Sequence, residues 1–578
     1  MAVDPKPTAR KGQSTTLFSL SFPINPKHLP MKKLYILLLI FTTQFTFAQI
    51  RFQNIPEGAI YPESMVVETI TANIAYQGYD EGQAYFGQGE YEIYLDNIDG
   101  VLDNPIIVLD GFDPGDSRDI PGLYASLSFD GQNMADILRD EGFDIVILNA
   151  PLYTTGGKDI DGGGDYIQRN AMVLIALIQQ LNADKVGDNE LVVLGPSMGG
   201  LIARYALAYM EDNSLDAETR LYISFDSPHR GANIPISLQY LINYFADQVG
   251  DPTAQQVVDQ LLNSPAAKEM LVDHLLGHLL AGSTYEQDPT KVLPLGAPGF
   301  RNEFQAELDA LGFPTNVRNV TMINGSGNGT TTGSPGITIV DTNLTIDATT
   351  DIDVALKFTP PANQTNTVTD VTVNFFGFPI STYQTIAQST STSDGVDSSP
   401  GGTGSITDAL GDGGGNPVLI DFIEALQQDL YSFIPTMSSL AIDNPNWFAT
   451  PDLNDSPFVN FYIPNENEPH VTVTAESAQF ALDEIRNGTA SVDDNQFSNQ
   501  FVLAPNPVHQ TINIVIPNDF STQHLTTTVF SITGQMLMEN KWTNPSGELI
   551  WKHNLPSGIY ILKLNDGAAV QTIKLMVE

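Results

Sequence analysis

The chain has 578 residues, more than one hydrophobic core usually organises, so two or more domains are expected. Its 68 acidic and 25 basic residues give a formal net charge of −43. This charge argues against nucleic acid and anionic membranes as partners, because both are bound through cationic side chains. Cysteine is absent, which excludes disulfides and thiolate metal sites.

The N-terminal region has the pattern of an export signal. Two lysines in Met31–Lys33 precede the apolar run Leu34–Phe41, which is too short to span a bilayer, and Ala48 ends a small-x-small cleavage pattern. We therefore interpret residues 31–48 as a signal peptide, with the mature chain starting near Gln49. Residues 1–30 form an upstream extension.

From Gln49 onward, short apolar runs alternate with helical patterns. This alternation predicts a mostly parallel sheet with right-handed crossovers and functional sites at the carboxyl ends of its strands. The predicted strands are 91–95, Pro105–Leu109, Phe143–Leu148, Leu191–Leu194 and Arg220–Phe225, and the predicted helices between them are Asn133–Arg139, Tyr166–Leu181 and Leu201–Met210.

The second half of this domain interrupts the alternation twice. Amphipathic helices in 234–280 predict a cap over the site, at about 232–300. The strand Val317–Ile323 is followed by a Thr/Val-rich segment, about 335–390, which predicts an antiparallel β insertion. A helix at Ile420–Leu430, a strand at Phe458–Ile463 and a helix at Ala475–Arg486 complete the predicted domain, 49–489.

The C-terminal part differs in character. Residues 490–499 form a polar linker, and residues 500–578 consist of short β runs separated by Gly, Pro and Asn. This pattern predicts a small all-β sandwich domain.

One turn has the strongest chemical signature. Gly195-Pro-Ser-Met-Gly199 is a G-x-S-x-G sequence between a predicted buried strand and a predicted helix. The strained nucleophile turn needs small flanking residues, and the helix start directs N–H groups at the position of an oxyanion. Ser197 is therefore the candidate nucleophile, although an ordinary strand-to-helix turn has the same outline.

A nucleophilic serine needs a histidine base, and the chain has eight histidines. In a chain with this type of nucleophile turn the acid and then the histidine follow the serine, which favours His470 because it lies between the last strand and the closing helix. His229 follows a predicted strand end, and we expect a structural or pocket-lining role for it rather than a catalytic one. The i, i+4 pair His274 and His278 is more consistent with packing than with metal binding. The remaining histidines lie in the leader or the C-terminal domain: His28, His509, His524 and His553.

The acid and the oxyanion donors are predicted from loops. Asp394 and Asp397 both lie in a turn-rich loop before His470, and the sequence does not distinguish between them. The backbone N–H groups of Met198 and Phe112 are the candidate oxyanion donors, since Met198 follows the nucleophile and Phe112 follows the strand Pro105–Leu109.

Together these motifs resemble the lipase/esterase branch of the α/β-hydrolase superfamily. The segment Ser227-Pro-His-Arg-Gly231 is similar to the Thr-Pro-His-x-Gly of many bacterial lipases, and the segment around Asp394 is similar to their acid-bearing Asn-Asp-Gly-Leu-Val stretch. The resemblance implies an α/β fold of that type: a mostly parallel central sheet with a helical cap and a β insertion, followed by the β-sandwich domain. Asp110 departs from the family, because lipases usually have His at this position.

The last part of the chain resembles a type IX secretion system sorting domain of type A. The matching segments are Leu503–Pro507, Phe530–Gln535, Leu555–Tyr560 and Lys574-Leu575. The resemblance implies the type IX secretion machinery as a partner, with export across the outer membrane to the medium or the cell surface. A carbohydrate-binding β module is the alternative.

The expected function is hydrolysis of carboxylic esters through Ser197, His470 and Asp394 or Asp397, with no cofactor and no metal. Calcium binding in the acidic loops 110–119 and 159–165 is not expected. The alternatives are an acyltransferase or peptidase on the same fold, or a catalytically inactive surface binding protein. The acyl and alcohol groups of the ester and the oligomeric state stay open.

Overall fold

The computed structural model describes residues 66–410, 416–487, 501–503, 506–516, 522–531, 536–566 and 570–577. The predicted upstream extension, signal peptide and linker (1–30, 31–48 and 490–499) lie outside the described residues. Among the described residues no helix combines the length and the apolar character needed to cross a membrane.

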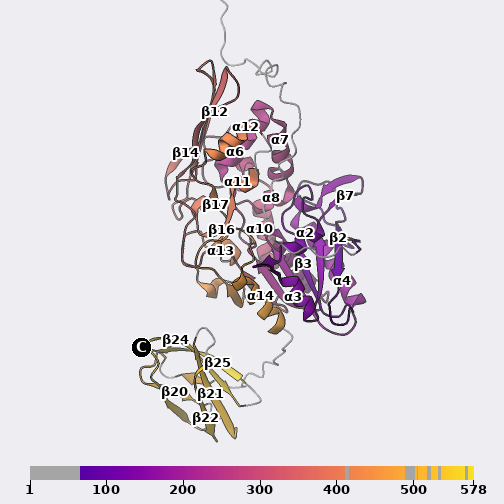
Figure 1. Ribbon diagram of the computed structural model, residues 1–578. Coiled ribbons are helices and arrows are strands. Elements are labelled where there is room, and N and C mark those ends of the chain that lie inside the picture. The colour runs from indigo at the N-terminus through magenta and orange to yellow at the C-terminus, as the bar shows by residue number, and fades with distance from the viewer. Residues whose placement is uncertain are drawn as a thin grey trace, which may run out of the picture.

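The large domain is built on a sheet of eight strands in the order β1-β2-β6-β3-β9-β10-β11-β18. Strands β2 and β3 of this sheet are labelled in Figure 1. Strand β2 pairs antiparallel with β1 and β6, and every other neighbouring pair is parallel, which confirms the predicted mostly parallel sheet. The bounds are β1 Glu68–Thr71, β2 Gln88–Tyr94, β3 Pro105–Leu109, β6 Asp144–Asn149, β9 Leu191–Pro196, β10 Thr219–Phe225, β11 Arg318–Met322 and β18 Asn460–Tyr462.

Both faces of this sheet are covered because its central strands are apolar at consecutive positions. In β3, Ile107 and Leu109 enter one hydrophobic core, while Ile106 and Val108 enter the core on the opposite face. The first core is closed by α4 (Ile167–Asp184) and α5 (Met198–Asp212), and the second by α2 (Ile120–Ala125), α3 (Met134–Asp140) and α14 (Ala475–Asn487).

A helical block follows β10 and forms the cap, as predicted. In Figure 1 its helices α6, α7 and α8 lie together in the upper half of the large domain. Two of its segments are π-helical, η3 (Phe245–Val249) and η4 (Val258–Leu262). The other helices of the cap are α6 Ile236–Tyr244, α7 Pro252–Val257, α8 Pro265–Met270 and α9 Leu275–His278, and α10 Arg301–Leu311 follows the cap.

Glu269 of α8 ties the cap to the body of the domain. It is fully buried, and its Oε2 accepts a 3.0 Å hydrogen bond from the backbone N–H of Ile167 at the start of α4. Burial raises the pKa of the Glu269 carboxyl well above its ordinary value of 4.5, because the charged form is cut off from water.

Glu269→Gln is therefore expected to stabilise the protein at pH 8. A raised folded-state pKa makes stability fall as pH rises from about 4.5 through the folded value, and each unit of difference costs about 1.4 kcal/mol. Thermal unfolding from pH 4.5 to 8 should show a difference between variant and wild type that grows with pH. Glu303→Gln, at an exposed position of α10, is the matched control and should leave the profile unchanged. A variant less stable than wild type at pH 8 would contradict the assignment.

The predicted β insertion is confirmed as a four-stranded antiparallel sheet, with the strands in sequence order. It packs against the cap, because Thr369 Oγ1 donates to the carbonyl of Ser237 and the Tyr383 ring stacks on Tyr244 at 4.6 Å between centroids. Its strands are β12 Thr338–Thr345, β13 Thr350–Lys357, β14 Thr365–Phe375 and β15 Phe378–Gln388.

The segment after the insertion differs from the prediction. The predicted helix Ile420–Leu430 extends too far, because α12 (Pro417–Glu424) already ends at Glu424 and Leu430 begins strand β17 (Leu430–Pro435). Strand β17 pairs antiparallel with β16 (Gly401–Ser405). The remaining elements are β4 Ser128–Phe129, β5 Gln132–Asn133, β7 Leu152–Thr155, β8 Lys158–Asp161, η2 Gly162–Gly164, η5 Val396–Ser398, α11 Ile406–Leu410, α13 Thr436–Ser439 and η7 Leu453–Asp455.

The C-terminal residues form two antiparallel sheets around a hydrophobic core of their own, which confirms the predicted all-β domain. One sheet has the order β19-β20-β23 and the other β22-β21-β24-β25. The bounds are β19 Val502–Leu503, β20 Thr511–Val515, β21 His524–Ser531, β22 Met536–Thr543, β23 Glu548–Lys552, β24 Gly558–Asn565 and β25 Val570–Val577.

Candidate active site

Ser197 lies at the sharp turn between β9 and α5. Its backbone has φ 52° and ψ −128°, which is strained for a residue with a side chain, and its N–H donates to the carbonyl of Phe225 at 2.8 Å. A Cβ at Gly195 would lie 2.5 Å from the Gly199 carbonyl oxygen, and a Cβ at Gly199 would lie 2.6 Å from that of Asp110. The turn therefore requires glycine on both sides of the serine, as the G-x-S-x-G pattern predicts.

His470 contacts this serine. It lies in the turn between β18 and α14, and its Nε2 is 2.9 Å from Ser197 Oγ. Its backbone N–H donates to Thr403 of β16, and the Phe433 ring of β17 packs edge-on at 4.9 Å between centroids. The β16–β17 pair thus fixes the imidazole in position, and the structure brings together the two residues that the sequence predicts as nucleophile and base.

The carboxylate that orients His470 belongs to Asp226, the residue directly after β10. Its Oδ2 is 2.6 Å from His470 Nδ1, and the side chain is fully buried. Its Oδ1 accepts hydrogen bonds from the backbone N–H of Asn324 at 3.1 Å and from Ser439 Oγ at 2.9 Å. Asp226 has φ 45°, and this turn directs its carboxylate from the sheet edge toward the imidazole.

Glycine on β16 leaves the space that this carboxylate occupies. A Cβ on Gly402 would lie 2.0 Å from Asp226 Oδ2, closer than atoms can approach. The acid is therefore held from three sides, by hydrogen bonds to Oδ1, by His470 at Oδ2 and by the backbone of β16.

Contrary to the prediction, Asp394 and Asp397 make no hydrogen bond with His470, and the carboxylate beside its Nδ1 is that of Asp226. Asp397 is buried and accepts from the backbone N–H and Oγ1 of Thr359 and from Asn233 Nδ2, at 2.7, 2.8 and 3.0 Å. Burial raises the pKa of its carboxyl. Asp394 accepts from the backbone N–H of Ala362 at 2.7 Å. Both carboxylates fasten the loop after the β insertion.

Asp226 has a sequence signal that makes it a third candidate acid beside Asp394 and Asp397. It directly follows β10, the strand that lies next to β9, so its side chain emerges at the same sheet edge as Ser197. An Asp directly after an apolar run, and before Ser227-Pro-His229, satisfies the order serine, acid, histidine.

The predicted oxyanion donors lie beside the nucleophile. Met198 is the first residue of α5 and is buried, and Phe112 follows β3 and lines the same pocket as Ser197. The loop of Phe112 is held by Arg118, whose Nη2 donates to the Phe112 carbonyl at 3.1 Å and to Asp110 Oδ1 at 2.8 Å. A buried ion pair thus fixes the backbone at Phe112.

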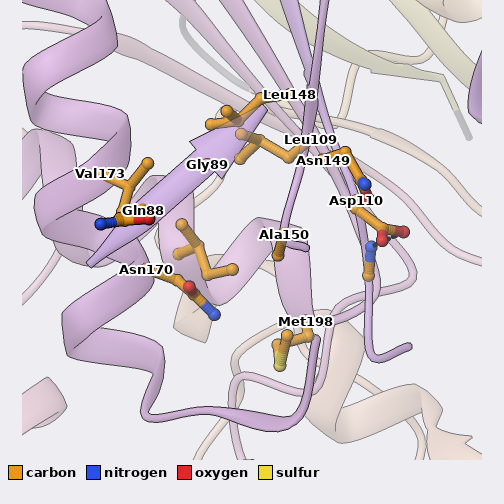
Figure 2. Close-up of a pocket in the computed structure, with 12 residues that line it drawn as sticks. Gln88, Gly89, Leu109, Asp110, Leu148, Asn149, Ala150, Asn170, Val173 and Met198 are labelled. Atoms are coloured by element: carbon orange, nitrogen blue, oxygen red, sulfur yellow. Dashed lines mark hydrogen bonds between the residues drawn. The ribbon is translucent and has the colours of Figure 1, made fainter. Parts of the chain in front are cut away.

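Asp110 stands at the position where lipases usually have histidine, and its carboxylate is paired with Arg118. Burial, opposed by Arg118, raises the pKa of its carboxyl to about 6. Its Oδ1 also accepts from the N–H of Gly111 at 2.7 Å. Figure 2 shows Asp110, Asn149 and Met198 around a second pocket, which is also lined by residues of β2 and α4.

The pocket at Ser197 is almost entirely apolar. Its walls come from the loop after β3 that carries Phe112, from the cap and from β17. The residues that line it with Ser197 are Phe112, Pro228, Ala232, Ile234, Leu261, Ala267, Met270, Leu271, Phe433 and Ile434. Such walls suit a hydrocarbon chain and offer no charged group to a polar substituent.

The other histidines of the domain, His229, His274 and His278, are buried and take part in packing and hydrogen bonds away from Ser197. His229 is fully buried between Phe313 and Phe458, its Nε2 is 2.9 Å from Ser224 Oγ, and burial holds its pKa well below the usual range. His274 precedes α9 and contacts the carbonyl of Leu262, while His278 contacts Asp273. Within the described ranges, no three His, Asp or Glu side chains are placed to hold a metal ion together.

Two family models match the chain. Residues 149–252, which include β9, Ser197, α5 and Asp226, match the family described as "Putative serine esterase (DUF676)". Residues 502–578 match the "Secretion system C-terminal sorting domain" family. None of the curated proteins compared with the chain matches it.

Several solved structures are similar to parts of the chain. The lipase BlEst2 from Bacillus licheniformis in its mature form is 13% identical, with 41% of this chain and 72% of that chain covered and a TM-score of 0.23. Its propeptide form is 10% identical, with 84% and 76% covered and a TM-score of 0.28. The rice cell wall degrading esterase LipA from Xanthomonas oryzae is 13% identical, with 45% and 75% covered and a TM-score of 0.25.

Proposed function

We propose that this chain, an α/β-hydrolase of the serine esterase and lipase type with a type IX secretion sorting domain, cleaves carboxylic ester bonds through Ser197, His470 and Asp226. The observation that carries the proposal is one continuous hydrogen-bond chain. It runs from Ser197 Oγ to His470 Nε2 at 2.9 Å and from His470 Nδ1 to Asp226 Oδ2 at 2.6 Å, and all three side chains are buried.

The proposed reaction has two halves. His470 Nε2 takes the hydroxyl proton while Ser197 Oγ bonds to the ester carbonyl carbon, and Asp226 stabilises the imidazolium that forms. The N–H groups of Met198 and Phe112 bind the oxyanion of the tetrahedral intermediate. His470 then gives its proton to the leaving alcohol oxygen, and the C–O bond breaks to leave an acyl-enzyme. Water, deprotonated by His470, repeats the sequence and releases the acid and Ser197.

Ester hydrolysis is distinguished from its alternatives by the substrates of the wild-type protein. p-Nitrophenyl butyrate should be hydrolysed, whereas the p-nitroanilide of the same acyl group should be cleaved at least about a thousandfold more slowly. Faster anilide cleavage would favour a peptidase, and acyl transfer to an added alcohol that exceeds hydrolysis would favour an acyltransferase. Failure to turn over any of these would favour the inactive binding protein.

The apolar pocket at Ser197 supports an acyl group of hydrocarbon character, and this gives a test by chain length. Ala267→Leu in α8 adds methyl groups to the pocket wall and should lower kcat/KM for the octanoate ester relative to the butyrate ester by about tenfold or more. Each buried CH₂ of the acyl chain contributes about 0.8 kcal/mol, about fourfold in kcat/KM. Met270→Ala, which widens the same pocket, is the matched control and should shift the ratio the opposite way. If wild type and both variants show the same ratio of kcat/KM for the octanoate and butyrate esters, the acyl chain does not bind in this pocket.

The C-terminal domain supports export as part of the proposed function. The sorting domain at 502–578 implies the type IX secretion machinery as a partner and export to the medium or the cell surface. We also propose that the signal peptide at 31–48 is removed before export across the outer membrane. The mass of the N-terminal peptide of the exported protein tests it, and a start near Gln49 is expected.

A further inference from the structure

The turn of the β14–β15 hairpin carries a group of exposed apolar side chains. Phe376 is 66% exposed, Phe378 73% and Ile380 51%, and Phe375 packs against Phe376 with 4.7 Å between ring centroids. Phe375 pairs with Phe378, so the loop is the two residues Phe376-Gly377, both with positive φ, at 50° and 75°. Asn, Asp or Gly usually fill such positions, and a bulky aromatic residue there is strained. The sequence thus exposes a large ring at a backbone position that disfavours it.

This tip, which we define as Phe375–Ile380, is carried on a rigid support. The inner face of the sheet is buried, and Tyr383 of β15 both stacks on Tyr244 of the cap and donates its hydroxyl to the Tyr285 carbonyl at 3.1 Å. In Figure 1 the sheet labelled β12 and β14 rises beside α6 and α12. The tip is therefore joined through packed side chains to the same cap that lines the pocket at Ser197.

Negatively charged side chains beside the tip disfavour anionic binding partners. The turn between β12 and β13 lies next to the tip, because the Phe376 N–H donates to the Thr349 carbonyl. Asp347 in that turn accepts hydrogen bonds from Thr349 and Thr350, and Asp351 accepts from Asn343 and Asn374. These bonds hold the pKa of both carboxyls below the usual range, so the tip is flanked by fixed negative charge.

We infer that the Phe375–Ile380 tip docks the protein onto the uncharged surface of aggregated lipid esters. The rings supply apolar contact, while Asp347, Asp351 and the overall charge of −43 repel anionic surfaces. This inference deepens the proposed function and rests on it for the identity of the aggregate, since long-chain esters suited to the pocket at Ser197 gather in droplets.

Binding is measured on the Ser197→Ala background, so that hydrolysis plays no part. The protein should cosediment with triolein droplets stabilised by phosphatidylcholine, and Phe376→Ser/Phe378→Ser should weaken this binding at least about tenfold. The matched control Ile98→Ser/Leu152→Ser removes two apolar side chains of similar exposure, 69% and 58%, from other loops and strands and should bind like its parent. Droplets coated with phosphatidylglycerol should bind more weakly.

Three results would overturn the inference. These are unchanged droplet binding by the Phe376/Phe378 variant, equal loss in the control variant, and stronger binding to phosphatidylglycerol. A dimer of the parent that the Phe376/Phe378 variant disrupts in gel filtration would assign the tip to a second copy of the chain instead.

With Ser197 intact, the Phe376/Phe378 variant should hydrolyse dissolved p-nitrophenyl butyrate at the unmodified rate. Absence of that activity in every protein would refute the proposed function and leave the binding result standing.

Discussion

Ser197→Ala is expected to lower kcat for p-nitrophenyl butyrate by about a millionfold, because removal of the nucleophile leaves only the oxyanion donors and the pocket. The serine turn is rigid and the change removes one oxygen atom, so the fold should persist. Near-ultraviolet circular dichroism and thermal unfolding check this directly.

Ser227→Ala is the matched control for this change. Ser227 is also fully buried and lies close to the same turn, where a Cβ on Gly200 would meet its Oγ, but it donates to the carbonyls of Gly195 and Phe225 and makes no hydrogen bond with His470. Its loss should change kcat by less than about tenfold, since a typical hydrogen bond contributes about 1 kcal/mol. A Ser197→Ala protein that keeps the wild-type rate would place the nucleophile elsewhere.

Asp226→Asn is expected to lower kcat by about ten-thousandfold with little change in KM. An amide at this position can donate to His470 Nδ1, which leaves the proton on Nε2 and prevents that nitrogen from accepting the proton of Ser197. The hydrogen bonds that Asp226 Oδ1 accepts from Asn324 and Ser439 can be kept by the amide oxygen, so the fold should survive. Steady-state kinetics with p-nitrophenyl butyrate provide the measurement.

The two acids favoured by the sequence serve as controls for Asp226. Asp394→Asn should keep kcat within about tenfold of wild type. Asp397→Asn should lower the thermal stability, because this carboxylate accepts three hydrogen bonds in a buried site, and should spare kcat in the folded protein. A folded Asp397→Asn variant that loses more activity than Asp226→Asn would restore Asp397 as the acid.

The contact between the candidate nucleophile Ser197 and the candidate base His470 could be predicted because the signals of these two residues are local or come from elimination. The apolar run before Ser197 and the glycines around it specify a buried strand and a tight turn within a few residues. His470 follows from its place between the last strand and the closing helix. The acid could not be assigned in the same way, since Asp226, Asp394 and Asp397 all follow the serine and precede the histidine. Only the strand order places Asp226 at the correct edge.

The β16–β17 pair shows a second limit of sequence reading. Gly401-Gly-Thr-Gly-Ser405 has the composition of a loop, yet it forms a strand, and its glycines leave room for side chains of β17. A Cβ on Gly401 would lie 2.3 Å from Ser432 Oγ, and a Cβ on Gly404 would lie 2.5 Å from the Tyr431 ring. The glycines are thus required by close packing against residues about thirty positions later in the chain. The predicted helix Ile420–Leu430 extends too far because the local sequence does not show that Leu430 pairs with β16.

Covalent labelling of Ser197 tests the central claim most directly. The purified protein, treated with a fluorophosphonate and digested, should yield one modified peptide, with the phosphonyl group on the Ser197 oxygen. Asp226→Asn should be labelled far more slowly, and Asp394→Asn at the wild-type rate. Absence of labelling in the folded wild-type protein, or a modification at another residue that persists in Ser197→Ala, would contradict the assignment of Ser197, His470 and Asp226.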